Sequence, residues 1–251
     1  MSPRVEGAGV ELAYEEHGSG PPILLVHGLA ADARALAPVA ETLASDARVI
    51  AHDRRGYGAS GSPEPYTGTT VMEQAEDAAA VLTGLGAAGA VVAGEGFGAL
   101  VALDLLLRHA ALVRAAVVAD PPLFALVPEA TEALAAQRLE VHEALRDRGP
   151  EAGVAAYLAG RAGSEALERA SAAYRGFYAD FAGLASWPVT RRDLRSLAQP
   201  VVVLTGPGTA PAVRLAAERL AALLPDVRRS DDGDLAAAVR ELLGQPPRSW
   251  K

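Results

Sequence analysis

The stretch Ala90-Val91-Val92-Ala93-Gly94-Glu95-Gly96-Phe97-Gly98-Ala99 decides the fold of this 251-residue chain. Its four leading apolar residues predict a buried strand over Ala90–Ala93. The glycines at 94, 96 and 98 predict a sharp turn at which other backbone can approach closely. The Ala/Leu-rich run that follows predicts a helix over Ala99–His109. The stretch therefore predicts a strand, a tight turn and a helix, with Gly96 in the middle of the turn.

The same succession recurs along the chain and predicts an α/β fold, with a mainly parallel sheet covered by helices on both faces. Two more loops follow predicted strands: His27-Gly28-Leu29-Ala30, and the longer stretch from His52 to Gly61. The predicted strands are Glu11–Glu16, Ile23–Val26, Arg48–Ala51, Ala90–Ala93, Ala115–Ala119, Val201–Leu204 and a weak one at Val227–Arg229. The helices between them are expected at Ala33–Ser45, Thr70–Leu85, Ala99–His109, Pro211–Leu224 and Leu235–Leu243.

From Pro121 to about Thr190 the alternation stops and the sequence predicts helices only. They are expected at Pro128–Arg148, Glu151–Ala159 and Ser164–Ala185. We interpret residues 122–189 as a helical cap inserted into a core formed by residues 1–121 and 190–251. Such an insert either shapes a pocket at the strand ends or serves only as a stabilising layer.

Taken together, the three loops at the predicted strand ends closely resemble those of the α/β-hydrolase family. In that family a G-x-S-x-G turn holds a serine nucleophile above the sheet. The corresponding stretch here is Gly94-Glu95-Gly96-Phe97-Gly98, so the nucleophile position holds Gly96. The stretch Asp53-Arg54-Arg55-Gly56-Tyr57-Gly58 resembles the family's D-x-R-G-x-G turn, which implies a structural role in holding loops together.

The resemblance also implies positions for the triad acid and base, and neither holds the usual residue. Thr209 stands where the family has its acid after the penultimate strand, and Asp234 stands where it has its histidine. No histidine follows His142 in the chain. Because loss of the serine or histidine of such a triad lowers turnover by about a million-fold in subtilisin, the sequence predicts a degenerate catalytic triad at Gly96, Thr209 and Asp234.

The family's oxyanion hole consists of backbone N–H groups, which survive any side-chain replacement. By resemblance these are the N–H groups of Leu29 and Phe97, next to Gly96. Three side chains are candidates for acid–base catalysis. Asp120 ends a strand at the entry to the cap, where it either acts as a base or caps a turn. Glu95 is expected to be buried with a raised pKa, or paired with an arginine. His27 either anchors the oxyanion loop or transfers protons.

Several further residues are candidates for substrate contact. Asp32, Arg34 and Tyr57 lie on loops at the predicted strand ends. In the cap, Tyr174 and Tyr178 belong to an aromatic stripe at helical spacing, which either forms the cap's own core or lines a pocket for a ring-containing, polyketide-like ligand.

Composition excludes several classes of function. The formal net charge is −8 and there are no basic blocks, which argues against nucleic-acid partners. The chain has no cysteine, so disulfides, thiol nucleophiles and thiolate metal sites are excluded. The first ten residues, MSPRVEGAGV, lack the apolar core of a signal peptide, and no apolar run approaches the length of a membrane span. We expect a cytoplasmic protein with a small-molecule substrate or ligand and no cofactor or metal, and the sequence leaves a homodimer open.

Three hypotheses for function follow. The first is an enzyme that acts non-hydrolytically, by dehydration, isomerisation, cyclisation or decarboxylation, as a lyase, isomerase or cyclase of secondary metabolism. The second is a catalytically inactive pseudo-hydrolase that binds a ligand. The third is a hydrolase with displaced acid and base residues.

Overall fold

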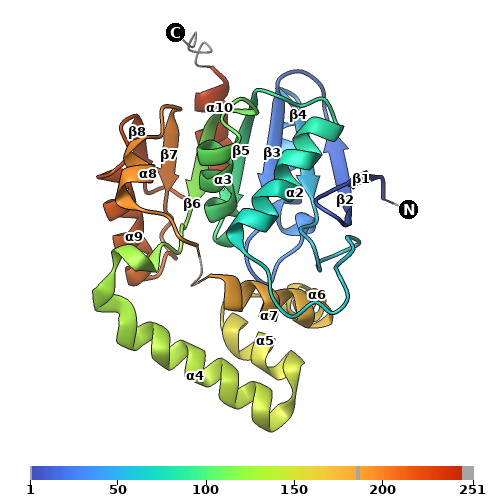
Figure 1. Cartoon of the computed structure of the whole chain (residues 1–251), viewed down its shortest axis with the longest axis vertical. Coiled ribbons are helices and arrows are strands. Elements are labelled where there is room, and N and C mark those ends of the chain that lie inside the picture. The colour runs from blue at the N-terminus through green and yellow to red at the C-terminus, as the bar shows by residue number, and fades with distance from the viewer. Residues whose placement is uncertain (1, 185–186, 245–251) are drawn as a thin grey trace.

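The computed structural model describes residues 2–184 and 187–244, which form one eight-stranded sheet with helices on both sides (Figure 1). The strand order is β1-β2-β4-β3-β5-β6-β7-β8; β1 and β2 are antiparallel to their neighbours and the rest of the sheet is parallel. The strands are β1 (Arg4–Glu6), β2 (Glu11–His17), β3 (Pro22–Val26), β4 (Arg48–His52), β5 (Ala90–Glu95), β6 (Val113–Ala119), β7 (Val201–Leu204) and β8 (Val227–Ser230). The seven predicted strands are confirmed, and β1 was missed.

The two faces of the sheet bury alternate residues of each central strand, as the period of two requires. In β5, Ala90 and Val92 pack with α2 (Val71–Gly84), α3 (Phe97–Arg108) and α9 (Pro211–Ala221). Val91 and Ala93 pack on the opposite face with α1 (Ala37–Leu43) and α10 (Leu235–Leu243). The continuous apolar runs therefore reflect burial on both faces, and the α/β-hydrolase fold expected from the sequence is confirmed.

Three predicted helices are each split into two elements in the structure: Ala33–Ser45, Pro128–Arg148 and Ser164–Ala185. The segment expected as Ala33–Ser45 forms a 3-10 helix, η1 (Ala33–Leu36), followed by α1, which has Pro38 in its first turn, where a missing N–H is tolerated. A short helix between the cap and β7, α8 (Arg191–Arg195), was not predicted; the side chain of Thr190 caps its start.

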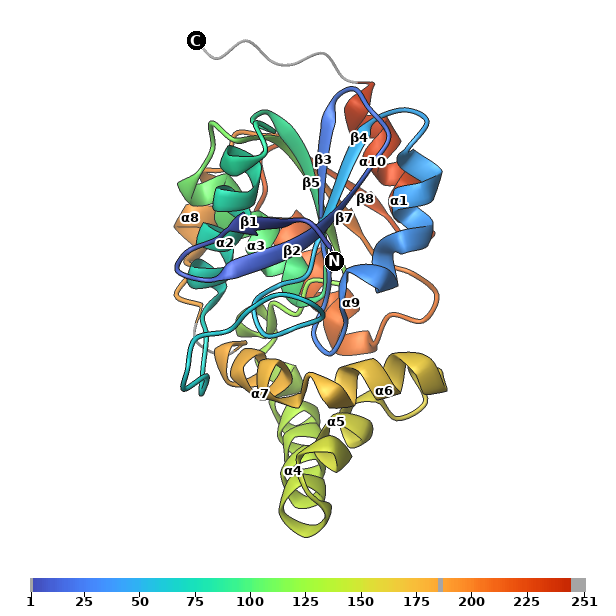
Figure 2. The same ribbon diagram turned by 90° about the vertical axis from the view of Figure 1, so that its right-hand side faces the viewer.

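The chain leaves the sheet at the carboxyl end of β6 and forms two 3-10 helices, η2 (Phe124–Leu126) and η3 (Pro128–Ala130). Four helices follow: α4 (Thr131–Arg148), α5 (Pro150–Leu158), α6 (Ser164–Ala172) and α7 (Tyr174–Gly183). In Figures 1 and 2 these four helices lie together beyond one end of the sheet. The division into a core and a cap at residues 122–189 stays a prediction.

The helix expected as Ser164–Ala185 is wrong as a single element, because it breaks at Ala173 into α6 and α7; its last residue, Ala185, lies outside the described residues. Close packing fixes the direction of α7: a side chain at Gly176 would collide with the backbone of Gly56. Within residues 2–184 and 187–244, the structure contains no helix that is long and apolar enough to cross a membrane.

One buried side chain is poorly accommodated in this core. His52, the last residue of β4, is 1% exposed, and neither of its ring nitrogens has a hydrogen-bond partner within the described residues. Burial and the nearby positive charge of Arg54 lower the pKa of His52 to about 3. The imidazole is therefore neutral in the folded protein throughout the range in which a free histidine gains a proton.

This difference predicts a pH-dependent stability. Below pH 6.5 His52 binds a proton in the unfolded state, whereas in the folded state it stays neutral down to pH about 3. The free energy of unfolding therefore falls as the pH falls from 6.5 to about 3. We expect His52→Phe to flatten this slope, by up to about 1.4 kcal/mol per pH unit, and to raise stability at pH 7. Urea denaturation between pH 4 and 7 measures both effects. Exposed His142→Gln is the control, and an unchanged slope in His52→Phe would contradict the assignment.

Candidate functional site

A fully buried arginine organises the carboxyl end of the sheet. Arg54 follows β4 and is 1% exposed. Its guanidinium donates from Nε to the carbonyl of His27 at 3.0 Å and from Nη2 to the carbonyl of Gly28 at 2.8 Å. Its backbone N–H donates to Nε2 of His27 at 2.9 Å. Arg54 thus fixes two successive peptide groups of the loop after β3.

The charge of Arg54 is balanced by an acidic residue of the cap. Asp180 on α7 is 0% exposed, and its Oδ2 lies 2.7 Å from Nη2 of Arg54. The hydroxyl of Tyr57 donates to the same oxygen at 2.7 Å, and the side-chain amide of Gln74 donates to Oδ1 at 2.5 Å. All four side chains are buried, so through Arg54 this carboxylate ties α7 to the loop that carries Leu29, one of the two predicted oxyanion donors.

Aromatic rings complete the surroundings of the guanidinium. Arg54 lies 4.9 Å from the ring centre of Tyr57 and 4.8 Å from that of Phe97, the first residue of α3. Cation–π contacts of this kind strengthen when they are removed from water. The same cation therefore touches both chain segments that flank the predicted oxyanion hole.

The turn between β5 and α3 keeps the geometry of a nucleophile elbow although its central residue has no side chain. Gly96 has φ 55° and ψ −117°, a conformation that L side chains rarely adopt. A Cβ atom added at Gly94 would collide with the backbone of Gly98, and one added at Gly98 would collide with the backbone of Val26. At Gly96 the nearest atom to an added Cβ is 3.7 Å away, the Cα of Gly28. The flanking glycines are thus required by space, whereas the middle position has room for a side chain.

The two predicted oxyanion donors lie on two segments of the chain that pack against each other. Gly98 packs directly against the carbonyls of Val26 and His27. Phe97 comes directly before Gly98, and Leu29 comes two residues after His27. Phe97 is the first residue of α3, so its N–H has no partner within the helix and carries the positive end of the helix dipole. The arrangement suits a carbonyl oxygen that gains negative charge.

Two carboxyl groups lie beside the elbow. Glu95 ends β5 opposite Ala119 of β6, and Asp120 follows directly, while the N–H of Gly96 donates to the carbonyl of Ala119 at 2.9 Å. Partial removal from water and the neighbouring Asp120 carboxylate raise the pKa of the Glu95 carboxyl. Glu95 is exposed rather than buried, whereas the predicted rise of its pKa is borne out. Within the described residues, no ion pair joins it to an arginine.

Thr209 orients Asp120. The threonine hydroxyl donates to Oδ1 of Asp120 at 2.6 Å and accepts from the N–H of Gly206 at 2.7 Å. Asp120 itself has φ 47°, a left-handed conformation that is uncommon for a residue other than glycine. Asp234, in contrast, is exposed and caps the start of α10 by accepting from the N–H of Ala237 at 2.9 Å.

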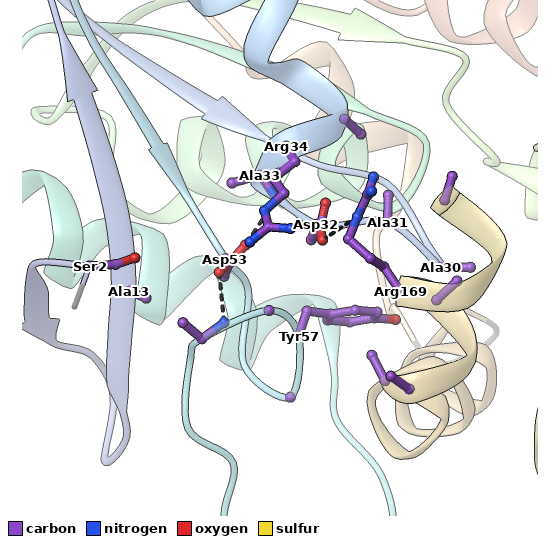
Figure 3. Close-up of a pocket in the computed structure, with 18 of the residues that line it drawn as sticks. Ser2, Ala13, Ala30, Ala31, Asp32, Ala33, Arg34, Asp53, Tyr57 and Arg169 are labelled. Atoms are coloured by element: carbon purple, nitrogen blue, oxygen red, sulfur yellow. Dashed lines mark hydrogen bonds and ion pairs between the residues drawn. The ribbon is translucent and has the colours of Figure 1, made fainter. Parts of the chain in front are cut away.

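A pocket of about 410 Å³ lies apart from the elbow, between the loops after β3 and β4 and helix α6 (Figure 3). Asp32, Arg34 and Tyr57 line it together with Asp53 and Arg169, as the close-up shows. Asp53 holds the loops, because its two oxygens accept from the N–H groups of Ala33 and Ala59. Asp32, Arg34 and Tyr57 thus lie around this pocket, apart from the predicted residues at the elbow.

Comparison with known proteins identifies the family. A family model described as the alpha/beta hydrolase fold matches residues 21–159. The 2-(acetamidomethylene)succinate hydrolase of Mesorhizobium japonicum (strain LMG 29417 / CECT 9101 / MAFF 303099) is 30% identical over 242 residues, which cover 90% of this chain and 85% of that protein. The chain belongs to the α/β-hydrolase family.

Two further matches differ in how much of each chain they cover. The uncharacterized hydrolase YraK of Bacillus subtilis (strain 168) is 36% identical over 119 residues, 47% of this chain and 44% of YraK, so this match spans less than half of that protein. The structure of a thermophilic esterase from Thermogutta terrifontis, with malate bound, superimposes with a TM-score of 0.76 at 25% identity and covers 97% of this chain and 98% of the esterase.

The three residues at the predicted triad positions have other contacts. Gly96 offers no nucleophile, Thr209 hydrogen-bonds Asp120, and Asp234 caps a helix. His27 uses both ring nitrogens on backbone: Nδ1 donates to the Gly28 carbonyl and Nε2 accepts from Arg54. Burial and the charge of Arg54 lower the pKa of His27 well below its usual value. These contacts favour the anchoring role for His27 over proton transfer.

The cap tyrosines lie outside the Figure 3 pocket. The Tyr178 hydroxyl donates to the Pro150 carbonyl at 3.0 Å, and Tyr174 is half-buried. Phe177 and Phe181 stack with their ring centres 5.4 Å apart inside the cap. The aromatic stripe therefore forms the cap's own core, and its use for a ring-containing ligand stays a prediction.

Sequence reasoning missed Arg54, Asp180 and Arg169. The first two form the buried ion pair, and Nε of Arg169 on α6 lies 2.9 Å from Oδ2 of Asp32. Arg54 stands beside Arg55 in the loop motif, and nothing in the sequence distinguishes the roles of these two arginines. Asp180 lies among the apolar residues of a predicted helix, but the sequence around it does not indicate which residue it pairs with.

The space at Gly96 predicts the effect of restoring the family's serine. Gly96→Ser should fold, with a free energy of unfolding lower by about 1–3 kcal/mol because of the unfavourable backbone conformation. It should not react with a fluorophosphonate, since no histidine is placed to activate the hydroxyl. Thermal denaturation and mass spectrometry measure both. Gly98→Ser is the matched control and should be far less stable, because its side chain collides with Val26; stoichiometric labelling of Gly96→Ser would contradict the account.

Proposed function

We propose that this chain hydrolyses a small ester, lactone or amide without forming a covalent enzyme intermediate. The observation that carries the proposal is the elbow itself: the Gly96 turn keeps its unusual conformation and its neighbouring N–H donors, while Glu95 and Asp120 lie beside it. The hydrolase names of the relatives support hydrolysis over the non-hydrolytic reactions considered from the sequence.

The substrate carbonyl oxygen would accept from the N–H groups of Leu29 and Phe97. Each such donor is worth about 3–4 kcal/mol to a developing oxyanion. Ionised Glu95 takes a proton from water as the water oxygen bonds to the carbonyl carbon. The bond to the leaving group then breaks, and the proton passes from Glu95 to that group. The products are a carboxylic acid and an alcohol or amine, and the glutamate returns to its ionised state.

Asp120 and Thr209 would act on this reaction through Glu95. The Asp120 carboxylate raises the pKa of Glu95 and so makes the ionised glutamate a stronger base. Thr209 holds Asp120 in place through its hydroxyl. Asp120 is therefore a positioning and electrostatic residue in this proposal, and Glu95 is the catalytic one.

A second candidate is a non-hydrolytic reaction, namely dehydration, isomerisation, cyclisation or decarboxylation. The raised pKa of Glu95 favours it, because a carboxyl group that holds its proton nearer neutrality can donate as well as accept one. The same oxyanion donors would stabilise an enolate. The third reading, a protein that binds ligand without turnover, predicts no dependence of any reaction on Glu95.

Substitution at Glu95 tests the proposal. With p-nitrophenyl acetate as the probe, we expect slow turnover without an initial burst, and a loss of about 100-fold or more in Glu95→Gln, the usual contribution of a general base. Glu132→Gln, an exposed residue of α4, is the control and should retain full activity. A burst of product with an acylated protein in the mass spectrum would refute the non-covalent route, and unchanged turnover in Glu95→Gln would refute the role of Glu95 as the base. Absence of turnover in the unsubstituted protein would support ligand binding alone.

Removal of the neighbouring charge makes a separate prediction. Asp120→Asn keeps an oxygen that can accept from Thr209 but loses the negative charge, so the pKa of Glu95 should fall. The acid limb of the pH–rate profile should therefore move to lower pH, with a lower plateau rate because the base is weaker. Stopped-flow rates between pH 4 and 8 measure this. A profile that stays in place in Asp120→Asn would contradict the coupling of the two carboxyl groups.

A further inference from the structure

Helix α4 packs against the rest of the chain along one side only. It runs along the outer edge of the four helices that lie beyond the sheet, and its main neighbour is α5 (Figures 1 and 2). Of its 18 residues only Val141 and Ala144 are buried, and residues 131–140 include no buried one. Since helices in proteins owe most of their stability to the packing of one face, the long outer side of α4 is a candidate interaction surface.

A leucine lies at the centre of this outer side. Leu139 is 58% exposed, and the only other large apolar residue exposed in the described part of the chain is Met72, at 36%. Because an α-helix turns once in about 3.6 residues, Leu139 points to the side opposite Val141 and Ala144. Its neighbours on that side, one and two turns away in each direction, are all exposed: Glu132, Ala135, Ala136, His142, Glu143 and Arg146. Together with Leu139 they form the outer face of α4.

Two copies of the outer face have complementary charges when their helices are antiparallel. Glu132 lies seven residues before Leu139 and Arg146 lies seven residues after it, which is about 10 Å along the helix in each direction. A two-fold axis at Leu139 therefore places each Glu132 opposite Arg146 of the second copy. Parallel helices would instead place each of these charges beside the same residue of the second copy, where like charges repel.

The sizes of the facing side chains are also complementary in the antiparallel arrangement. Ala135 and Ala136 of one helix lie opposite His142 and Glu143 of the other, so that small side chains meet large ones. Such pairing lets the two helix axes approach to about 8–10 Å. Leu139 then meets Leu139 of the second copy on the axis, which removes both side chains from water.

The existing contact of Arg146 does not prevent this pairing. Its guanidinium binds the neighbouring Asp147 at 2.7 Å, but both side chains are more than half exposed. Ion pairs between exposed groups contribute little to stability, and a guanidinium has five N–H donors. Arg146 is therefore able to bind Glu132 of a second copy.

We propose that the outer face of α4 binds the same face of a second copy of this chain and forms an antiparallel, two-fold symmetric homodimer. The interface has an apolar centre and charged pairs at its rim. One helix from each copy buries less than the area of a standard interface, about 1,600 Å², so we expect micromolar rather than nanomolar affinity. No residue of the elbow takes part, and the dimer is therefore independent of the hydrolysis proposed above.

Sedimentation velocity from about 10 µM to about 1 mM protein tests the proposal. We expect a monomer–dimer equilibrium in this range. Leu139→Glu places two like charges on the two-fold axis and should weaken the dimer at least tenfold. Met72→Glu changes the other exposed large apolar residue, so it is the matched control and should leave the affinity unchanged. A protein that stays monomeric at the highest concentration, or equal affinity in Leu139→Glu and the unsubstituted protein, would overturn the proposal.

Exchange of the two charges tests the antiparallel orientation. Glu132→Arg and Arg146→Glu each bring like charges together, and each should weaken the dimer at least tenfold. The double variant restores opposite charges and should recover most of the lost affinity. Because both side chains are exposed, the fold should be retained in all three variants. A double variant that dimerises no more tightly than the single ones, or full affinity in all three, would refute this interface; neither result bears on the role of Glu95 in hydrolysis.

Discussion

The contact between Arg54 and Asp180 is the interaction on which the site depends. A guanidinium that is 1% exposed and a carboxylate that is 0% exposed meet at 2.7 Å, and the same guanidinium binds the carbonyls of His27 and Gly28. Buried ion pairs contribute little net stability compared with apolar packing, but removal of one partner costs about 3–5 kcal/mol because the other charge stays buried. The pair therefore acts as a constraint: the cap must be in place for the loop after β3 to keep its peptide orientation.

This constraint acts on the loop that carries one of the predicted oxyanion donors. The predicted donors are backbone groups, and the segments that bear them are held by Arg54, by the ring of Phe97 and by the close approach of Gly98 to Val26. None of these contacts involves a serine at 96 or a histidine near 234. The loops are thus held by residues other than those at the predicted triad positions. The chemistry proposed here uses what remains beside the elbow, a solvent-accessible glutamate whose pKa a neighbouring aspartate raises.

Much of the fold could be predicted from sequence because burial on both faces leaves continuous apolar runs such as those of β5 and β6. The elbow was also predictable from its three alternating glycines, since Gly94 and Gly98 make close backbone contacts and Gly96 has a positive φ. Tertiary contacts decided what the sequence could not show. The break between α6 and α7 contains no proline or glycine, and no local pattern shows that Gly176 of α7 packs against Gly56. The burial of Arg54 depends on Asp180, whose pairing across the chain leaves no local pattern.

Hydrogen exchange at the backbone amide of Arg54 tests the central claim most directly. This N–H donates to His27 and stays protected only while the loop keeps its orientation. In Asp180→Asn the account predicts faster exchange at Arg54, with an acceleration at least tenfold greater than that at Val92 in the middle of β5. Equal acceleration at both amides would show only a general loss of stability. That result, or unchanged exchange at Arg54, would contradict the claim that the cap carboxylate holds the oxyanion loop.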